Sequence, residues 1–250
     1  MSIRILPGRQ FAPSWGFTVL TLLLCAVFIF LGRWQWHRGE ARQAEWDRFS
    51  RGAEQIVPLG ARGIDEVPRF QRISVVGRYD GSRQFLLDNR SHEGRAGYEV
   101  LTPLVRPNGR TLLVDRGWVP FAGVRSELPP VDLTTDGTET VTGRTDDLPT
   151  AGLASGRAAP AGTSPWPKVT AFPSMSQLSM ALGVALEPRI VLLDAQADHG
   201  YVRDWHPPGL EPMRHWSYAV QWWGFAALSV ILWVVLSSRK AGPAKPAAAG

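Results

Sequence analysis

The sequence predicts an α+β membrane protein in which two transmembrane helices flank a β-rich, antiparallel, barrel-like domain with one short helix. This fold class rests on two long uncharged apolar runs, on several strand-like segments between them, and on one segment with helix-capping signals. The chain has 250 residues, of which 44% are hydrophobic and 20% are charged. That composition excludes a disordered or collagen-like chain and allows one or two folded domains.

Charges are unevenly distributed along the chain. The net charge is +5, and all 22 acidic residues lie between Glu40 and Glu211. The positive excess therefore belongs to the terminal segments, whose basic residues are Arg4, Arg9, Arg239, Lys240 and Lys245. Because the central part is neutral, it lacks the basic patch of a nucleic-acid-binding domain, and we expect no nucleic-acid partner.

Each apolar run is long enough to cross a membrane. Residues 11–32 carry no charge, and neither do residues 216–238. About 20 helical residues span a hydrocarbon core of about 30 Å. Tryptophans flank the first run and lie along the second, as expected of side chains that favour the headgroup region. The alternative, two buried helices of a soluble protein, is disfavoured because neither run has a polar face.

The first run also resembles the apolar part of a signal peptide, but no small-x-small cleavage site follows it, so we expect an uncleaved anchor. By the positive-inside rule, the unopposed basic residues place both termini in the cytoplasm. This predicts a multi-pass protein of the inner (cytoplasmic) membrane with a periplasmic domain. The expected segments are a tail at 1–10, a span at 11–32, the domain at 33–215, a span at 216–238 and a tail at 239–250. Cys25, the single cysteine, lies within the first run and excludes a disulfide framework.

Short alternating or apolar segments between turn signals predict about six strands in the domain. They lie at residues 72–79, 84–88, 98–102, 110–115, 138–145 and 189–194. The pair Asn108-Gly109 predicts a hairpin turn before the fourth segment. Mostly sequential strands with hairpin connections indicate an antiparallel sheet curled into a barrel-like shape.

One short helix is predicted at residues 174–182. Ser174 and Gln177 have the spacing of a capping box, and Gly183 follows the last helical residue. Residues 38–51 are polar and predict a helical continuation of the first span. Residues 146–168 are rich in Ala, Gly, Pro, Ser and Thr and predict a flexible loop.

Enzyme motifs are scarce, and we expect a protein that is not an enzyme and has no catalytic residue. The chain has no Gly-x-Ser-x-Gly elbow, P-loop or dinucleotide fingerprint, and its five histidines are never spaced as a metal pair on one helix. The segments 115–118 (Asp-Arg-Gly-Trp) and 88–90 (Asp-Asn-Arg) could form active-site loops. An ion-paired strand end followed by a turn is the simpler interpretation, and Gly117 would then provide a positive φ or a close approach.

His215 lies one residue before the second apolar run. On a helix it shares a face with Tyr218, Ala219 and Trp222. A neutral imidazole at the membrane surface can ligate haem iron, and the stripe offers aromatic surface to a flat macrocycle, which the small Ala219 would let approach the backbone. Alternatively, His215 anchors the helix at the interface and the aromatic side chains pack on the first helix. His37, which follows the first run at the same membrane face, is the rival ligand.

Several sequence blocks follow one another in the order of a known family. They are Leu31-Gly32-Arg33-Trp34-Gln35-Trp36-His37-Arg38, Phe70-Gln71-Arg72 with Val76-Gly77, Gly97-Tyr98-Glu99-Val100 with Thr102-Pro103-Leu104, Leu113-Val114-Asp115-Arg116-Gly117-Trp118-Val119-Pro120, and His215-x-x-Tyr218-Ala219-x-x-Trp222. In these blocks the chain resembles the surfeit locus protein 1 family, bacterial type, whose members are assembly factors for haem–copper cytochrome c oxidase. Asp115 departs from the family, where Asn is common, and we expect it to pair with Arg116.

The resemblance implies a β-rich domain outside the cytoplasmic membrane and a role as a chaperone in maturing the largest oxidase subunit of the respiratory chain. It also implies haem a as a cofactor, because bacterial members are proposed to bind it through a histidine at the position of His215. Tyr218 and Trp222 would then contact the ring. The implied partners are the haem–copper oxidase large subunit, a haem a synthesis enzyme and the membrane. A structural scaffold that binds the oxidase subunit without haem, and a membrane-anchored periplasmic sensor or enzyme, remain as alternatives.

Overall fold

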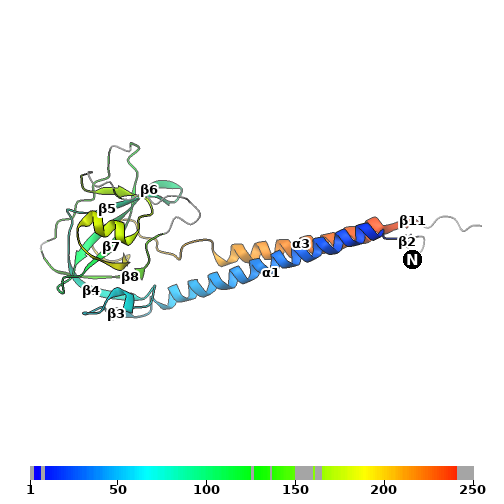
Figure 1. The fold of residues 1–250 in the computed structure, drawn as a ribbon, viewed down its shortest axis with the longest axis horizontal. Coiled ribbons are helices and arrows are strands. Elements are labelled where there is room, and N and C mark those ends of the chain that lie inside the picture. The colour runs from blue at the N-terminus through cyan, green and yellow to red at the C-terminus, as the bar shows by residue number, and fades with distance from the viewer. Residues whose placement is uncertain are drawn as a thin grey trace, which may run out of the picture. The chain divides into compact units, whose positions relative to one another are not determined.

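The computed structural model of the chain describes residues 3–6, 9–124, 127–135, 137–149, 160 and 165–240. The chain divides into two compact units. One unit contains residues 1–45 and 208–250, and the other contains residues 46–207. Long helices dominate the first unit and a curled sheet dominates the second (Figure 1).

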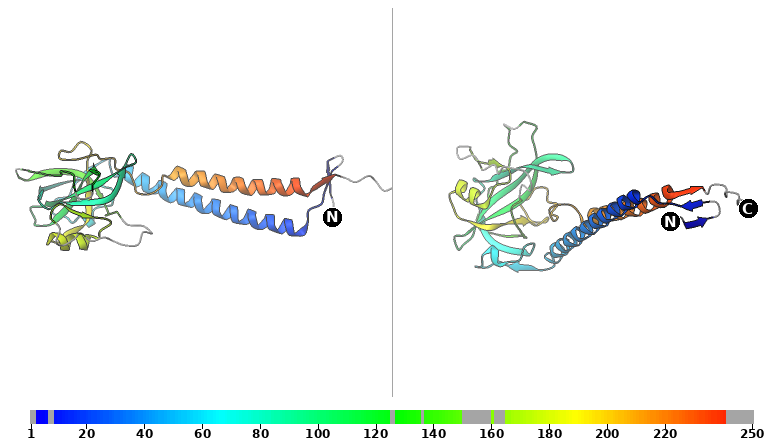
Figure 2. Two further views of the ribbon diagram at one scale, coloured as in Figure 1. Left: turned by 90° about the horizontal axis from the view of Figure 1, so that it is seen from above. Right: turned by 45° about the vertical axis from the view of Figure 1, so that its right-hand side comes forward.

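Two helices form most of the first unit and lie side by side in every view (Figure 2). They are α1 (Trp15–Arg51) and α3 (Pro212–Ser237). Both are long and apolar enough to cross a membrane, as judged by length and composition. A small sheet with the order β1-β2-β11 is formed by β1 (Ile3–Leu6), β2 (Arg9–Phe11) and β11 (Ser238–Lys240).

The helices begin at different residues from the predicted spans. α1 starts at Trp15, not at residue 11, because Phe11 belongs to β2 and Ser14 accepts a hydrogen bond from the backbone N–H of Phe17 at 3.4 Å. α3 starts at Pro212, and a proline in the first turn loses no helical hydrogen bond. The polar continuation predicted at residues 38–51 is helical throughout.

Small residues let α1 and α3 pack closely. A Cβ atom at Gly32 would overlap the indole of Trp223, and one at Gly39 would overlap the indole of Trp216. The ring of Trp36 lies 5.7 Å from that of Trp223, between centroids. Helices in lipid associate through such close contacts, since apolar side chains gain nothing by leaving the acyl chains.

The second unit is built around a closed barrel of five strands in the order β4-β8-β10-β7-β6, with β6 pairing again with β4. These strands are β4 (Arg72–Tyr79), β6 (Arg95–Val105), β7 (Thr111–Pro120), β8 (Glu139–Asp146) and β10 (Leu186–Leu193). The sheet continues beyond β6 with β5 (Phe85–His92) and β9 (Lys168–Thr170), and beyond β4 with β3 (Ile56–Pro58). A one-turn 3-10 helix covers Ile64–Glu66.

The predicted fold class is confirmed: in sequence, two candidate transmembrane helices flank a sheet domain with a closed barrel and one short helix. Antiparallel pairing holds around the barrel except between β7 and β10, which are parallel. The outer pairs β3–β4 and β5–β9 are parallel as well. The predicted antiparallel sheet therefore contains some parallel pairs, in the barrel because not all neighbouring strands are consecutive in the chain. The chain reaches β10, the neighbour of β7, only after β8, β9 and α2 (Met175–Leu182).

The turn and cap signals are confirmed. Ser174 and Gln177 form the reciprocal capping box at the start of α2, and Gly183 ends the helix at a φ of +77°. Gly109, in the hairpin between β6 and β7, has a φ of +82°. Most of the loop predicted at residues 146–168 lies outside the described residues; its first residue, Asp146, ends β8, and its last, Lys168, begins β9.

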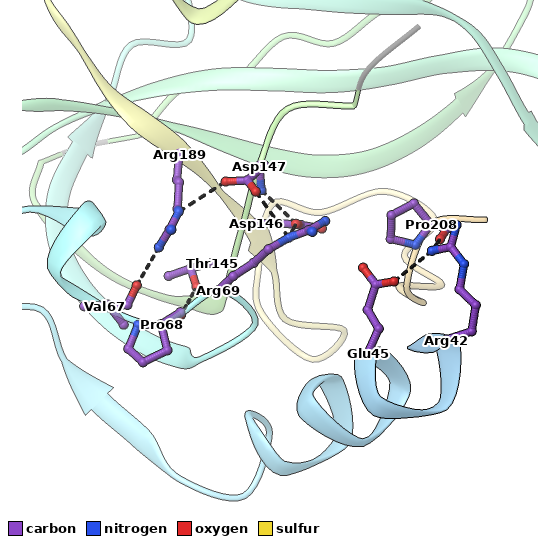
Figure 3. A network of polar contacts seen from close by, with 10 residues as sticks. All are labelled: Arg42, Glu45, Val67, Pro68, Arg69, Thr145, Asp146, Asp147, Arg189 and Pro208. Atoms are coloured by element: carbon purple, nitrogen blue, oxygen red, sulfur yellow. Dashed lines mark hydrogen bonds and ion pairs between the residues drawn. The ribbon is translucent and has the colours of Figure 1, made fainter. Parts of the chain in front are cut away.

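Both faces of β7 are buried, whereas β4 buries alternate residues only. In β7, Leu112 and Val114 join one apolar cluster, while Leu113 on the opposite face joins another that includes Leu178 and Leu182 of α2. Ion pairs hold the end of β8 in place. The Arg69 Nε atom lies 2.6 Å from Asp146 Oδ1 and 3.4 Å from Asp147 Oδ2, and Arg189 Nε lies 3.2 Å from Asp147 Oδ1 (Figure 3).

Candidate functional site

The imidazole of His215 is held by a side chain of α1. His215 lies in the first turn of α3, and its Nδ1 atom is 2.9 Å from Oε1 of Gln35. An amide oxygen can only accept a hydrogen bond, so the neutral tautomer that makes this contact is the one with its proton on Nδ1. In the neutral ring, Nε2 therefore carries the lone pair that a metal ion needs.

The side chains of the aromatic stripe predicted on α3 have different surroundings in the structure. Trp222 turns toward α1 and stacks on Phe28, with 5.8 Å between ring centroids. Ala219 is completely buried, and the approach of a macrocycle to the backbone there stays a prediction. Tyr218 is 48% exposed and lies at the outward edge of the stripe. Tyr218 is thus the exposed member of the predicted haem-binding set. His215 and Trp222 are half-buried, and Trp222 is shared with the helix contact.

His37, the rival ligand, lies on another face of α1. It follows Gln35 by two residues, which is a rotation of about 200° around a helix. Its Nδ1 atom is 2.9 Å from Oε2 of Glu40, and its side chain is 59% exposed. The side chains of His37 and His215 are therefore not brought together as two axial ligands of one iron.

The site fits haem in its donor set. In the described part of the chain, no group of three or more His, Cys, Asp or Glu side chains could hold a bare metal ion. Haem iron needs only an axial donor from the protein, because the macrocycle supplies the other ligands. His215 offers one ring nitrogen held by an acceptor and a second that makes no hydrogen bond within the described residues.

The Asp115-Arg116 pair expected in the family block is wrong. Neighbouring residues of a strand point to opposite faces, and these two side chains have separate partners. The Oδ1 atom of Asp115 accepts a hydrogen bond from the N–H of Gly117 at 3.0 Å. Arg116 donates from Nε to the carbonyl of His199 at 2.6 Å and from Nη1 to Oε1 of Gln84 at 2.9 Å. Arg116 thus links the segment that contains His199 to β7.

Gly117 has the predicted positive φ, at +108°, but it does not end the strand. The register between β6 and β7 shifts here, so that Arg116 and Gly117 form a β-bulge. Beyond the bulge, Trp118 and Val202 exchange backbone hydrogen bonds of 2.8 and 3.2 Å. The expected strand end and turn are therefore replaced by a bulge that binds another segment of the domain.

The segment Asp88-Asn89-Arg90 belongs to β5 and also contains a register shift. Asn89 has a φ of +63°, and the guanidinium of Arg90 lies 3.0 Å from the Glu99 carboxylate and 5.2 Å from the ring of Phe172. A cavity of about 310 Å³ adjoins this segment. Its lining holds neither a histidine nor a cysteine, and we assign it no chemistry.

Sequence reasoning missed the role of Gln35. It was part of the block at residues 31–38 but had no assigned partner. The signal lay in its spacing, because Gly32, Gln35 and Gly39 recur at intervals of three and four residues and share one helix face.

Comparison with known proteins agrees with these blocks. A family model described as the SURF1 family matches residues 22–227, which include both Gln35 and His215. Uncharacterized SURF1-like proteins of Mycobacterium bovis and Mycobacterium tuberculosis are 30% identical to the chain over 169 residues. The match covers 65% of this chain and 58% of each relative, so it spans less than two thirds of the length of those proteins.

Proposed function

This chain belongs to the SURF1 (surfeit locus protein 1) family, whose members are generally cytochrome oxidase assembly factors, and we propose that it assists the assembly of a haem–copper oxidase without being an enzyme. In this proposal it holds haem a and hands it to the large oxidase subunit. It lies in the cytoplasmic membrane with its β domain in the periplasm and both termini in the cytoplasm.

The observation that carries the proposal is the hydrogen bond of 2.9 Å between Gln35 and His215. A histidine that serves only as an interfacial anchor needs no particular tautomer. A histidine that binds a metal usually donates its second N–H to an acceptor, which fixes the ring and raises the basicity of the ligating nitrogen. His215 is arranged in this second way.

In the proposed site, each residue has one task. His215 binds the iron through Nε2, and Gln35 holds its Nδ1–H. Tyr218, which is half exposed, offers an aromatic face and a hydroxyl to the edge of the ring. Trp222 supports the site from the side of α1, where it stacks on Phe28. When bound, haem a would supply the iron that accepts the imidazole nitrogen.

The site would hold haem at a depth where transfer within the membrane is possible. His215 is in the first turn of α3, next to the residues that begin the apolar span. A ligand held there can pass to a neighbouring membrane subunit without crossing water. We expect both proposed partners, the enzyme that makes haem a and the large oxidase subunit, to meet this site from within the membrane.

The test is purification of the full chain in detergent from cells that co-express the haem a synthesis enzymes. We expect a-type absorbance in the purified protein and co-purification of the oxidase large subunit. Cells without haem a synthesis serve as the control and should yield protein without the a-type band. Protein that carries no a-type haem under the first condition would contradict the haem-binding proposal.

A scaffold that binds the oxidase subunit without haem is the second candidate. It is favoured by Ala219 and Trp222, which the helix pair already uses for its own packing. Under this reading the oxidase large subunit co-purifies equally well with and without haem a synthesis, and no haem absorbance accompanies it.

A further inference from the structure

We infer that Gln35 is a positioning residue for the haem ligand, because its side-chain oxygen fixes the imidazole of His215 with Nε2 as the ligating atom. This inference rests on the proposed function. It adds a residue on the other helix to the site, and it makes the α1–α3 contact part of the haem-binding machinery.

The first step in the argument is that two close contacts set the register of the helices, one on each side of Gln35 along α1. Gly32 receives the indole of Trp223, and Gly39 receives the indole of Trp216. Gln35 lies between the two glycines in sequence and on the same face of α1. A rotation or slide of α1 by one residue would break both tryptophan contacts, so the amide of Gln35 is held opposite His215.

The second step is chemical. The oxygen of Gln35 lies 2.9 Å from Nδ1 of His215, within ordinary hydrogen-bond distance. Accepting the Nδ1 proton selects one of the two neutral tautomers and stops rotation of the ring about its Cβ–Cγ bond. It also shifts electron density toward Nε2, which strengthens the bond from that atom to a metal.

The third step is the contrast with His37. Its Nδ1 contacts Glu40, three residues along the same helix, in a pair that is more than half exposed on both sides. A contact of that kind forms on an isolated helix and is weak. Gln35 and His215, by contrast, are 180 residues apart and meet only when the helices pair.

The test uses Gln35→Leu, Gln35→Glu and a matched control, Gln221→Leu, whose side chain is exposed on α3. Each full-length variant is purified after co-expression with haem a synthesis. We expect Gln35→Leu to retain haem about 10-fold less well than the wild type, as for other residues that support a metal ligand. Gln35→Glu should retain haem because it keeps the acceptor. Gln221→Leu should match the wild type.

The spectroscopic readout is the iron–histidine stretching band in resonance Raman spectra of the ferrous protein. A carboxylate at position 35 accepts the Nδ1 proton more strongly than an amide, so Gln35→Glu should move this band to higher frequency and lower the reduction potential. The haem retained by Gln35→Leu should show the opposite shifts. A side chain that only fills space would move neither quantity.

The outcomes separate this inference from the proposed function. If His215→Ala keeps its haem, the proposed ligand is wrong and the role of Gln35 is overturned with it. If His215→Ala loses haem while Gln35→Leu keeps wild-type retention and the wild-type Raman band, only the inference about Gln35 is overturned. Loss of haem in both Gln35→Leu and Gln35→Glu would also overturn it, since the acceptor would not then rescue binding.

Discussion

At Gly117, both the backbone conformation and the closeness of neighbouring atoms disfavour a side chain. Its φ is +108°, and a Cβ atom there would lie 2.5 Å from the carbonyl oxygen of Val202 and 2.8 Å from Cγ of Arg203. Gly109 has a similar positive φ but no atom within 4 Å of the same position, so it isolates the cost of the conformation alone. The two glycines therefore form a matched pair.

We predict that Gly117→Ala destabilises the β domain more than Gly109→Ala does. The change at Gly109 should cost about 1 kcal/mol, the strain of an L-residue at positive φ. The change at Gly117 should cost about 3 kcal/mol, because the backbone of Val202 must also move. Thermal unfolding of both full-length variants in detergent, followed by circular dichroism, measures the difference. Equal melting temperatures would show that the contact with Val202 is not close.

Asp115 is a buried carboxyl group whose ionisation is costly. It is 1% exposed, and burial together with the nearby Glu99 carboxylate raises its pKa well above the ordinary value of 3.8. The positive charge of Arg90 lowers the pKa of Asp115, and the negative charge of Asp146 raises it. As pH rises above the ordinary pKa of an aspartic acid, residue 115 releases its proton in the unfolded chain before it does so in the native protein. The native state then holds more protons, so stability falls with rising pH across that interval.

Asp115→Asn should remove this loss of stability. Asparagine keeps the oxygen that accepts the N–H of Gly117 and has no charge to bury. We predict that the wild type and the variant melt at similar temperatures near pH 4. As pH rises toward 7, the melting temperature of the variant should increasingly exceed that of the wild type. Melting curves across this range provide the measurement. A difference that does not change with pH would contradict the assigned ionisation of Asp115.

At the residue scale, sequence predicted the local contacts but not the distant ones. The capping box of Ser174 and the positive φ of Gly117 depend on neighbours within a few positions. The partners of Arg116 and His215 are brought close only by the fold. No spacing rule connects residues so far apart, which is why the Asp115-Arg116 pair was expected and Gln35 had no assigned partner.

At the scale of elements, the α1–α3 contact depends on the small residues of α1. Gly32→Leu would force the indole of Trp223 out of its position, whereas Gly16 has no atom near the corresponding Cβ. Cys25, whose Sγ atom lies 3.6 Å from the carbonyl of Ala226, reports on the contact. We predict that a short bismaleimide links Cys25 to an introduced Ala226→Cys. The yield should fall in Gly32→Leu and remain unchanged in Gly16→Leu, as measured by gel mobility. Equal yields in both would exclude a packing role for Gly32.

Strand positions were more predictable than strand partners. The segments predicted at residues 72–79 and 138–145 correspond closely to β4 and β8, because alternation of apolar residues has the period of a strand. Alternation does not report the direction of the neighbouring strand, so the parallel β7–β10 pair was not predicted. The short strands β3 and β9, with three residues each, carry too few residues to show a period.

At the scale of the whole molecule, the distribution of charge predicts how the chain lies in the membrane. The basic residues of the two terminal segments have no acidic residue near them in the sequence, and the positive-inside rule places them in the cytoplasm; they are Arg4, Arg9, Arg239, Lys240 and Lys245. We predict that alkaline phosphatase, which is active only outside the cytoplasm, is active when fused after Gly109 and inactive when fused after Lys240. Activity of the second fusion alone would reverse the topology and place the β domain in the cytoplasm.

The central claim is that His215 ligates haem a, and the amount of haem a per purified chain tests it most directly. The wild type, His215→Ala and His37→Ala are compared after co-expression with haem a synthesis, each shown by its melting curve to be folded. We predict that His215→Ala loses most of its haem, because the proposed iron ligand is removed, and that His37→Ala retains it. Full retention of haem in His215→Ala, or its loss in His37→Ala alone, would contradict the account.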